Sequence, residues 1–299
     1  MNPLWIVNPS AGRGRGARVA ADLRGRLAAR SLDGDIVQTS GPWDAVRLAR
    51  EAAERGAPLA VAVGGDGTAH EVVNGLAGTE TTFGLVPVGS GNDLALALGV
   101  PSTVDAALDV IAARRERRID LGRFDDDRYF ANSLGLGFEA QVTIESRKVR
   151  GLSGFAIYLW AVVRALAKLR CPDLRLVVDG QEIVGRRLLV CIGNGPRVGG
   201  GFLLTPDATN ADGLLDLCIV DAMGRLRVLR TLPKAISGTH VSLPVIRMMR
   251  GRTIEIESKE GFPFHADGEV IDVARRRLRI EVRAAMLKVL SGESPGGPA

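Results

Sequence analysis

The feature that most limits the fold of this chain is an alternation of apolar strands and helices over residues 1–120. The apolar runs are PLWIVNP, GDIVQTS, LAVAVGG and TTFGLVPVG, and helical patterns cover about 16–30, 42–56, 68–77, 91–99 and 103–114. Continuous apolar strands that alternate with helices indicate a parallel sheet covered on both faces. In such sheets ligands bind beyond the carboxyl ends of the strands. Glycine-rich turns follow the first, third and fourth strands, so we expect these turns to lie together.

The pattern changes near residue 120. The run IDLGRFDDDRYFANSLGLGF is typical of a hairpin with an Asp-rich turn, and helices are expected over about 139–169. Further strands are short and separated by Gly, Asp and Pro turns: LRLVVDG, RRLLVCIGN, GLLDLCIVD, RTIEIES, FPFHADGEVI and RLRIEV. They indicate an antiparallel sandwich. We predict an α/β domain of residues 1–121, to which the end of the chain at about 286–299 returns, and a β-sandwich domain of residues 122–285.

Composition and charge restrict the partners. The 299 residues carry a formal net charge of +5, and the basic residues are almost all arginine, with no lysine before Lys148. A phosphate held by residues 1–120 must therefore be neutralised by arginine, backbone N–H groups or a metal. The net charge suits an anionic partner such as a nucleotide or an acidic membrane surface. Nucleic acid is disfavoured, because the basic runs lie far apart and only 4% of the residues are aromatic, which leaves few rings for base stacking.

Three features bear on location. Cys171, Cys191 and Cys218 are an odd number without CxxC spacing, so we expect buried thiols in a reducing, cytoplasmic compartment. The N-terminus MNPLWIVNPSAG lacks the charged region and the long apolar run of a signal peptide. Segment 151–169 has apolar residues at helical spacing and is interrupted by Arg164, which predicts a packed or interfacial amphipathic helix and not a membrane span.

The first glycine-rich loop is NPSAGRGRG, residues 8–16. It contains G-x-G-x-x-A, a variant of the dinucleotide fingerprint, but no acid ends the second strand to hold a ribose. We therefore prefer a phosphate pocket lined by Asn8, Ser10 and the glycine backbone, with Arg13 or Arg15 supplying positive charge.

The second loop is GGDGT, residues 64–68. Its glycines allow positive φ and close approach of the backbone. Thr68 is expected to cap the following helix, whose positive end would face an anion. No G-x-x-x-x-G-K-[ST] motif occurs, so the chain is not a P-loop NTPase. A plain turn is the alternative, and the acid Asp66 suits an anion site only if a cation accompanies it.

The third loop is PVGSGNDLA, residues 87–95. Ser90 and Gly91 suit contact with phosphate, while Asn92 and Asp93 either cap the next helix or face a substrate. Three such loops at one edge of a sheet favour a nucleotide site more strongly than any one of them.

Together with DGLLD and DGE further along, the motifs NPSAG, GGDGT and GSGNDLA resemble in order those of the diacylglycerol kinase catalytic-domain superfamily. This superfamily includes bacterial diacylglycerol kinases, other bacterial lipid kinases, and sphingosine and ceramide kinases. GGDGT is shared with NAD kinases, whereas GSGND and the late DGE favour lipid kinases. The resemblance covers nearly the whole chain. It implies an N-terminal Rossmann-like or phosphofructokinase-like parallel α/β nucleotide domain and a C-terminal antiparallel β-sandwich domain, with the active site between them.

The resemblance also implies which residues form the site. Those expected to line ATP are Asn8, Pro9, Ser10, Ala11, Gly12, Thr39, Gly64, Gly65, Asp66, Gly67, Thr68, Ala69, His70 and Ser90, to which their chemistry adds Arg13, Gly91 and Asn92. Family members often carry a lysine after the first motif, and Arg13 occupies that neighbourhood here. The loop TNADGLLDL would hold a structural or regulatory Mg²⁺ through Asp212, with Thr209 and Leu214 contributing backbone oxygens. A Gly-Asp hairpin turn is the alternative for this loop.

The segment FHADGEV, residues 264–270, matches the family's catalytic segment. Phosphoryl transfer to a lipid alcohol needs a carboxylate that takes or orients the hydroxyl proton. Glu269 is the first choice for this base. Asp267 is the second, with metal binding or orientation of its neighbour as its other roles, and His265 is expected to be structural. Asp66 is the third catalytic candidate, expected to hold Mg²⁺ directly or through water against the ATP phosphates.

The leading hypothesis is an ATP- and Mg²⁺-dependent lipid kinase that phosphorylates a hydroxyl of diacylglycerol or a related lipid. The enzyme would be cytoplasmic with transient peripheral membrane contact, and segment 151–169 would help to receive acyl chains. One alternative is an NAD kinase-like kinase of a soluble acceptor, and another is a catalytically idle nucleotide- or lipid-binding regulator. The acceptor stays open among diacylglycerol, monoacylglycerol, phosphatidylglycerol and sphingoid bases. The oligomeric state also stays open, with a homodimer as one possibility.

Overall fold

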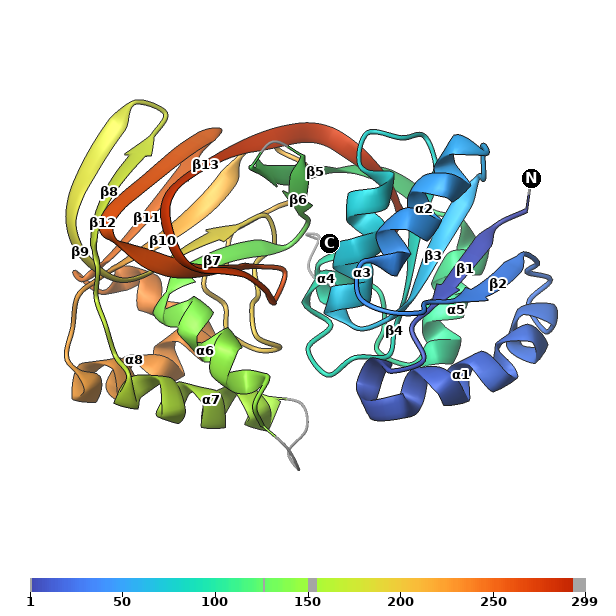
Figure 1. Cartoon of the computed structure of the whole chain (residues 1–299), viewed down its shortest axis with the longest axis horizontal. Coiled ribbons are helices and arrows are strands. Elements are labelled where there is room, and N and C mark those ends of the chain that lie inside the picture. Colours follow the sequence, from blue (N-terminus) through green and yellow to red (C-terminus); the bar gives the residue numbers. More distant parts are fainter. Residues whose placement is uncertain (1, 126, 150–154, 293–299) are drawn as a thin grey trace. The chain divides into compact units, whose positions relative to one another are not determined.

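The computed structural model describes residues 2–125, 127–149 and 155–292 of the chain. They form two compact units (Figure 1). The first comprises the chain up to Asp120 together with the segment from Ala285, and the second comprises Leu121–Ala284. The chain passes from one unit to the other within two strands, β5 (Glu116–Phe124) and β13 (Glu269–Leu290), which pair with each other.

A parallel sheet forms the centre of the first unit. Its strands are β1 (Leu4–Val7), β2 (Asp35–Gln38), β3 (Leu59–Gly64) and β4 (Thr82–Pro87). They are hydrogen-bonded in the order β2-β1-β3-β4, and the end of β13 pairs in parallel with β4, with Val289 opposite Phe83. β1, β3 and β4 are buried along their whole length, as expected for continuous apolar runs in a sheet covered on both faces.

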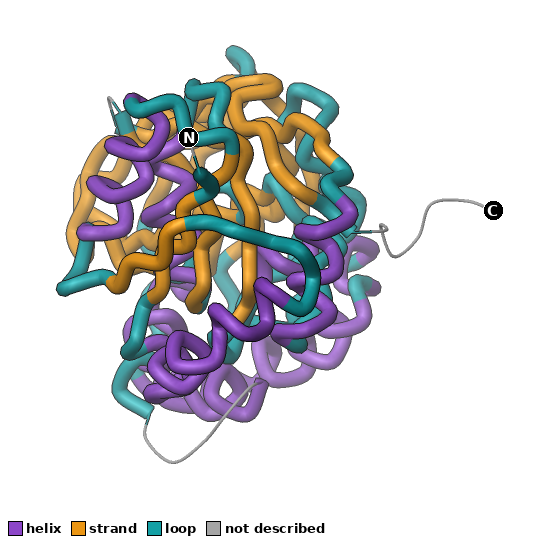
Figure 2. Tube along the Cα trace, turned by 90° about the vertical axis from the view of Figure 1, so that its right-hand side faces the viewer, coloured by secondary structure: helices purple, strands orange, loops and turns teal. Residues whose placement is uncertain are grey.

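Helices pack on both faces of this sheet (Figures 1 and 2). Those described in the first unit are α1 (Ala11–Ala28), α2 (Asp44–Glu54), α3 (Asp66–Leu76), α4 (Asp93–Ala97) and α5 (Val104–Ala113). α2 packs on α3, and the backbone N–H of Ala45 donates to Glu71 Oε2 at 3.1 Å. α1 packs on α5, and Arg30, just after α1, places its Nε 2.6 Å from Asp109 Oδ1. The predicted α/β class of this half of the chain is confirmed.

Two helices begin earlier than the sequence suggests. α1 begins at Ala11, but Gly12, Arg13 and Gly14 have φ values of 56°, 58° and 87°, so a kink separates the loop end of α1 from its regular part. α3 begins at Asp66 with Gly65 as its N-cap. The expectation that Thr68 caps α3 is therefore wrong, because Thr68 lies within the first turn and its side chain is buried.

The second unit is an antiparallel β-sandwich, as predicted. Its remaining strands are β6 (Arg128–Phe130), β7 (Ser133–Gly137), β8 (Asp173–Val178), β9 (Gln181–Gly193), β10 (Leu215–Asp221), β11 (Ile246–Gly251) and β12 (Thr253–Ala266). The first half of β9 pairs with β8, and its second half pairs with β7 and β10. β12 likewise pairs first with β8 and then with β7. The two long strands therefore belong to both layers, and the predicted hairpin of β5 and β6 is confirmed.

Two hydrophobic cores stabilise the second unit. One lies between the strand layers and is filled by apolar side chains from β5 to β10, β12 and β13, with the ring of Phe124 in contact with those of Phe130 and Phe264. The other lies between the outer face of β9 and β10 and the helices α6 (Phe138–Ser146), α7 (Phe155–Ala167) and α8 (Arg225–Ser237). Glu145 ties α6 to α7: its buried carboxylate accepts from Lys168 Nζ at 2.9 Å and Lys148 Nζ at 3.0 Å. These bonds, that of Lys168 first, lower the pKa of Glu145 to about 2.

α8 and β11 are not predicted from the sequence. Pro233 lies inside α8, where it removes a backbone hydrogen bond, and glycines at both ends of the segment resemble turn signals. Val228, Leu232 and Ala235, spaced at i, i+4 and i+7, nevertheless pack into the second core. Tertiary burial thus outweighs the proline.

Candidate active site

The three glycine-rich loops of the first unit lie at one edge of its sheet. The backbone N–H of Asn8 donates to Val63 O at 3.0 Å, that of Thr39 to Val7 O at 2.9 Å, and that of Val88 to Gly64 O at 2.7 Å. These bonds join the carboxyl ends of β1 to β4 side by side. The predicted convergence of the loops is confirmed, and Thr39 lies at the same edge.

The first loop is anchored to the second through Asn8. Asn8 Nδ2 donates to Thr68 Oγ1 at 3.0 Å, and its Oδ1 accepts from the backbone N–H of Ser10 at 3.0 Å. A Cβ at Gly12 would lie 2.2 Å from Val88 O, so this left-handed position must be glycine for the loop to reach the end of β4. Arg13 carries its side chain on the exposed side of the loop.

Asp66 joins the second loop to the third. Its Oδ2 accepts from the backbone N–H of Asn92 at 2.8 Å, and its Oδ1 accepts from that of Asp93 at 3.0 Å. A Cβ at Gly89 would lie 2.7 Å from Gly65 Cα, so the two loops approach backbone to backbone. Both carboxylate oxygens of Asp66 thus satisfy N–H groups at the start of α4, a role that sequence reasoning does not reveal.

Some predicted ATP-lining residues turn their side chains into the first unit. Ala69 and His70 are 1% exposed, and the His70 ring lies edge-on to Trp43 with 6.2 Å between centroids. Ser90 is exposed, and Gly91 and Asn92 are half-buried. Any contact of Ala69 or His70 with a nucleotide at this edge would therefore have to come from the backbone.

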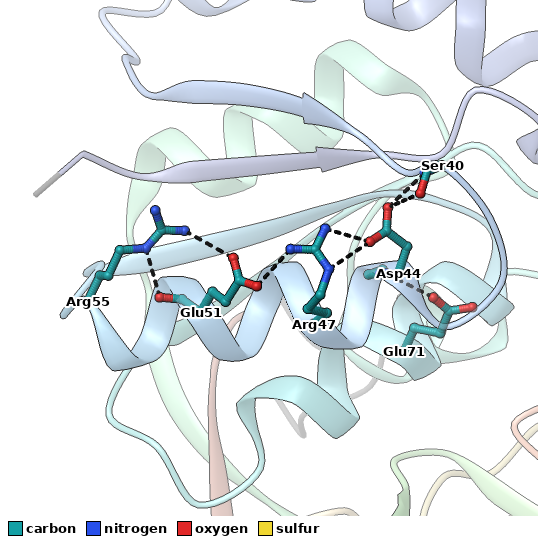
Figure 3. Close-up of polar contacts among 7 residues, drawn as sticks. Ser40, Asp44, Arg47, Glu51, Arg55 and Glu71 are labelled. Carbon is teal, nitrogen blue, oxygen red and sulfur yellow. Dashed lines mark hydrogen bonds and ion pairs between the residues drawn. The ribbon is translucent and has the colours of Figure 1, made fainter.

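The loop after Thr39 is fixed by Asp44 (Figure 3). Asp44 Oδ2 accepts from both the backbone N–H and the hydroxyl of Ser40 at 2.8 Å, and Oδ1 accepts from Arg47 at 2.7 Å. The two bonds from Ser40 and then the bond from Arg47 lower the pKa of Asp44 to about 2. The carboxylate is therefore ionised at neutral pH and holds the start of α2 against the end of β2.

In the second unit, Asp267 and Glu269 lie at the turn between β12 and β13 but in different surroundings. Asp267 is 8% exposed, and its carboxylate accepts backbone N–H bonds from Ala131 at 2.9 Å, Asn132 at 2.8 Å and Ser133 at 3.0 Å. Glu269 has a side chain that is 35% exposed and contacts Arg147, which also donates to Gly268 O at 3.2 Å. Asp267 braces the turn, and Glu269 is the more exposed of the two acids.

His265 supports this turn from below, as the sequence analysis expects. Its Nδ1 accepts from the backbone N–H of Gly268 at 3.3 Å, which leaves Nε2 as the ring nitrogen that donates. Nε2 then donates to Glu139 Oε1 at 3.2 Å in a buried pair. Sequence reasoning misses Glu139 and Arg147, because they lie more than a hundred residues before the turn, on and just after α6.

The TNADGLLDL loop gathers acids and an arginine. Asp212 Oδ1 accepts from the backbone N–H of Leu214 at 3.1 Å, and Asp212 Oδ2 contacts Arg250. Arg250 Nε also lies 3.1 Å from Asp216 Oδ1, while Asp216 Oδ2 is buried with no hydrogen-bond partner among the described residues. Burial raises the pKa of Asp216. Thr209 is exposed, and Asp216 was not foreseen from the sequence.

These acids do not form a complete metal-binding site by themselves. Within the described ranges, no group of three or more His, Cys, Asp or Glu side chains is arranged to hold a metal ion. The helices described in both units are also too short or too polar to cross a bilayer.

Comparison with known proteins places this fold and these motifs in a family. Residues 2–124 match the diacylglycerol kinase catalytic domain, and residues 132–291 match the YegS C-terminal NAD kinase β sandwich-like domain. A diacylglycerol kinase of Mycobacterium tuberculosis is 33% identical over 270 residues, which cover 88% of this chain and 87% of that protein. A probable lipid kinase YegS-like of Chromohalobacter salexigens is 37% identical over 238 residues, which cover 76% of this chain and 74% of that protein.

The likeness extends to a solved structure. A crystal structure of a diacylglycerol kinase from Bacillus anthracis superposes with a TM-score of 0.79 at 25% identity and covers 97% of both chains. The chain therefore belongs to the diacylglycerol kinase catalytic-domain family of lipid kinases.

Proposed function

We propose that this chain is an ATP- and Mg²⁺-dependent kinase that phosphorylates a hydroxyl of diacylglycerol or a related lipid. The observation that carries the proposal is the junction of three glycine-rich loops at the carboxyl edge of the first sheet, beside the N-terminus of α3. N–H groups without intrahelical partners and the positive end of a helix dipole suit a polyphosphate. Family membership supports a lipid alcohol as the acceptor.

The nucleotide would be held largely by backbone. Asn8 to Gly12, Gly64 to Thr68 and Ser90 to Asn92 supply the loops, with Thr39 beside them. Ala69 and His70 lie next along α3, where the N–H of Ala69 already donates to Gly65 O at 3.0 Å. Arg13 would supply the positive charge that a lysine provides in many family members. The ordered contact between Asn8 and Thr68 supports a preformed cradle.

Glu269 is proposed as the general base. The lipid hydroxyl oxygen attacks the γ-phosphorus and forms the new P–O bond while the bond to the β–γ bridging oxygen breaks. ADP leaves with that electron pair, and the hydroxyl proton passes to the Glu269 carboxylate. The exposure of Glu269 and the Arg147 contact that orients it support this role. We propose that Asp267 positions the turn that carries Glu269.

The residues of the TNADGLLDL loop fit a hard cation. Asp212 and Asp216 supply carboxylates, the partnerless buried Oδ2 of Asp216 is an oxygen donor without an assigned role, and Thr209 and Leu214 can add carbonyl oxygens. Mg²⁺ bound there would supply structural charge balance to the loop. We also propose that Asp66, in addition to its bonds to the third loop, would hold Mg²⁺ directly or through water against the ATP phosphates.

A kinase assay on a panel of lipids tests the proposal. Purified protein with Mg²⁺ and radiolabelled ATP is offered diacylglycerol, monoacylglycerol, phosphatidylglycerol and sphingoid bases, each in mixed micelles, and NAD⁺ as the soluble acceptor. We expect a labelled lipid phosphate identified by mass spectrometry. Label in NADP⁺ alone would instead support a kinase of a soluble acceptor. ATP binding without transfer to any acceptor would support an idle regulator.

Peripheral membrane contact is part of the proposal, since a diacylglycerol substrate resides in a bilayer. The exposed face of α7 presents Leu159, Trp160 and Val163. These side chains belong to segment 151–169, which is expected to meet acyl chains. Residues 151–154 of this segment lie outside the described ranges. A cytoplasmic location and a homodimer also stay predictions.

A further inference from the structure

A second helix of the sandwich unit, α8, has an unusual charge distribution. Its thirteen residues include Arg225, Arg227, Arg230 and Lys234 and no acid. On the strands of this unit some arginines face acids: Arg175 lies 2.9 Å from Glu182, and Arg279 lies 2.9 Å from Glu281. α8 therefore carries four positive charges and no acidic residue of its own to balance them.

The cations and the exposed apolar residues of α8 form two parallel strips. Val228 and Ala235 point into the core. On a helix with 100° per residue, Leu226, Leu229, Pro233 and Ile236 then fall along one flank of the outer face, and Arg227, Arg230 and Lys234 fall along the other. Leu226 is 73% exposed and Leu229 is 43% exposed. We call this outer face, with its apolar strip and its basic strip, the α8 surface.

The three cations of the basic strip are available to a partner. Within the described residues none of Arg227, Arg230 and Lys234 has an acidic side chain within ion-pair distance. They line an open hollow beside Thr231 and Leu243. A concentrated positive charge without protein counter-ions complements an anionic ligand.

Arg225 has a different role, because it fixes the helix. Its Nε donates to Leu166 O at 2.7 Å, and its Nη2 donates to Ala167 O at 3.3 Å, at the end of α7. α8 therefore lies against the end of α7 in the second unit (Figure 1). The α8 surface is presented on an anchored helix.

We propose that the α8 surface docks the protein on an anionic phospholipid bilayer. Lipid phosphates would meet Arg227, Arg230 and Lys234, while Leu226 and Leu229 would enter the boundary between headgroups and acyl chains. An amphipathic helix with a basic and an apolar side binds in the plane of such an interface. A nucleic-acid backbone could use the basic strip but not the apolar one. The inference rests on the proposed function in one respect: a lipid substrate is the reason that the protein would meet a bilayer.

The test is sedimentation with vesicles of phosphatidylcholine alone and of phosphatidylcholine mixed with phosphatidylglycerol. We expect the intact protein to bind the mixed vesicles more tightly, and to release them as salt is raised. The variant Arg227→Glu with Arg230→Glu should bind the mixed vesicles at least about 25-fold more weakly, since each cation near an anionic surface contributes roughly fivefold. Leu226→Gln should weaken binding at constant charge.

Matched controls lie in the same unit. Lys259→Glu with Arg276→Glu changes the charge equally at exposed positions of β12 and β13, and Val273→Gln alters a valine that is 66% exposed. Both should leave vesicle binding unchanged. If the controls weaken binding as much as the α8 variants do, or if phosphatidylglycerol adds nothing, the assignment is wrong. If the α8 variants still bind vesicles but no longer bind a single-stranded oligonucleotide, the α8 surface is a nucleic-acid site instead.

Activity separates this inference from the proposed function. Toward a short-chain diacylglycerol dissolved as monomer, the α8 variants should match the intact protein, whereas toward vesicle-borne diacylglycerol their rate should fall with binding. Docking through α8 without phosphorylation of any lipid would overturn only the proposed kinase activity. Lipid phosphorylation with unchanged vesicle binding of the α8 variants would overturn only the docking surface.

Discussion

At the scale of single residues, Asp267 and Glu269 show how the fold divides labour between two acids. They are two positions apart, but three backbone N–H groups occupy the carboxylate of Asp267, and Glu269 lies partly open beside Arg147. A sequence motif names both acids. Only the long-range contact with residues 131–133 tells them apart.

Glu269→Gln and Asp267→Asn should therefore fail in different ways. Glu269→Gln should lower kcat by about 10²–10⁴-fold, the usual contribution of a general base, with unchanged thermal stability and ATP affinity. Asp267→Asn replaces an acceptor oxygen by an amide that faces N–H donors, so it should cost about 1–3 kcal/mol of unfolding free energy. Steady-state kinetics and urea titration check both. Normal turnover of Glu269→Gln would refute its role as the base.

Asp66 has two proposed roles that one variant can separate. Asp66→Ala removes both acceptors for the N–H groups of Asn92 and Asp93, so it should lower ATP affinity and cost about 1–2 kcal/mol of stability. ATP binding is measured by calorimetry with Mg²⁺ and with EDTA. A loss confined to the Mg²⁺ condition would support the metal role. An equal loss in EDTA would leave Asp66 as a loop brace alone.

At the scale of elements, the predictable parts are those that local pattern determines. β1, β3 and β4 follow from apolar runs that are buried on both faces, and α2 follows from its spacing of Ala45, Ala49 and Ala52. α8 is missed because its proline argues locally against the helix that tertiary burial selects. The convergence of the loops was predictable from parallel topology. The partners of Asp66 and Asp267 and the Glu139 partner of His265 were not, since these bonds span distant segments.

The α2 N-terminus offers a pH-dependent test of such an element. The pKa of Asp44 is lowered to about 2 by Ser40 and Arg47, so its contribution to stability is complete above the unfolded value of 3.8 and is lost as the pH falls toward 2. Asp44→Asn should thus cost about 1–2 kcal/mol at pH 7 and much less near pH 2.5. The control Glu51→Gln removes two exposed ion pairs, with Arg47 and Arg55, and should cost under about 1 kcal/mol.

Denaturant titration of the intact protein, Asp44→Asn and Glu51→Gln at the two pH values gives these differences. A cost for Asp44→Asn that stays constant with pH would contradict the carboxylate bonds of Figure 3. Loss of stability in Asp44→Asn should also loosen the Thr39 loop, measurable as faster amide exchange at Ser40.

At the scale of the whole molecule, the chain order makes the two units unequal. Leu121–Ala284 is one continuous segment with two cores of its own, whereas the first unit is made of two separate segments, the second of which starts at Ala285. Val289 pairs with β4 opposite Phe83, the N–H of Ser291 donates to Arg115 O at 3.0 Å, and that of Gly78 donates to Met286 O at 3.1 Å. The last part of β13 is thus a structural strand of the first sheet.

Fragments should reproduce this asymmetry. Residues 121–284 expressed alone should be monomeric and melt cooperatively, because their cores are complete. Residues 1–120 alone leave the apolar edge of β4 unpaired and should aggregate, since an open edge strand recruits other chains. Joining residues 1–120 to 285–292 through a short Gly/Ser linker restores that partner and should give a soluble fragment with a sharp thermal transition. Size-exclusion chromatography and calorimetry compare the three fragments. A well-folded 1–120 fragment would show that the first sheet does not need the last part of β13, and would contradict this prediction.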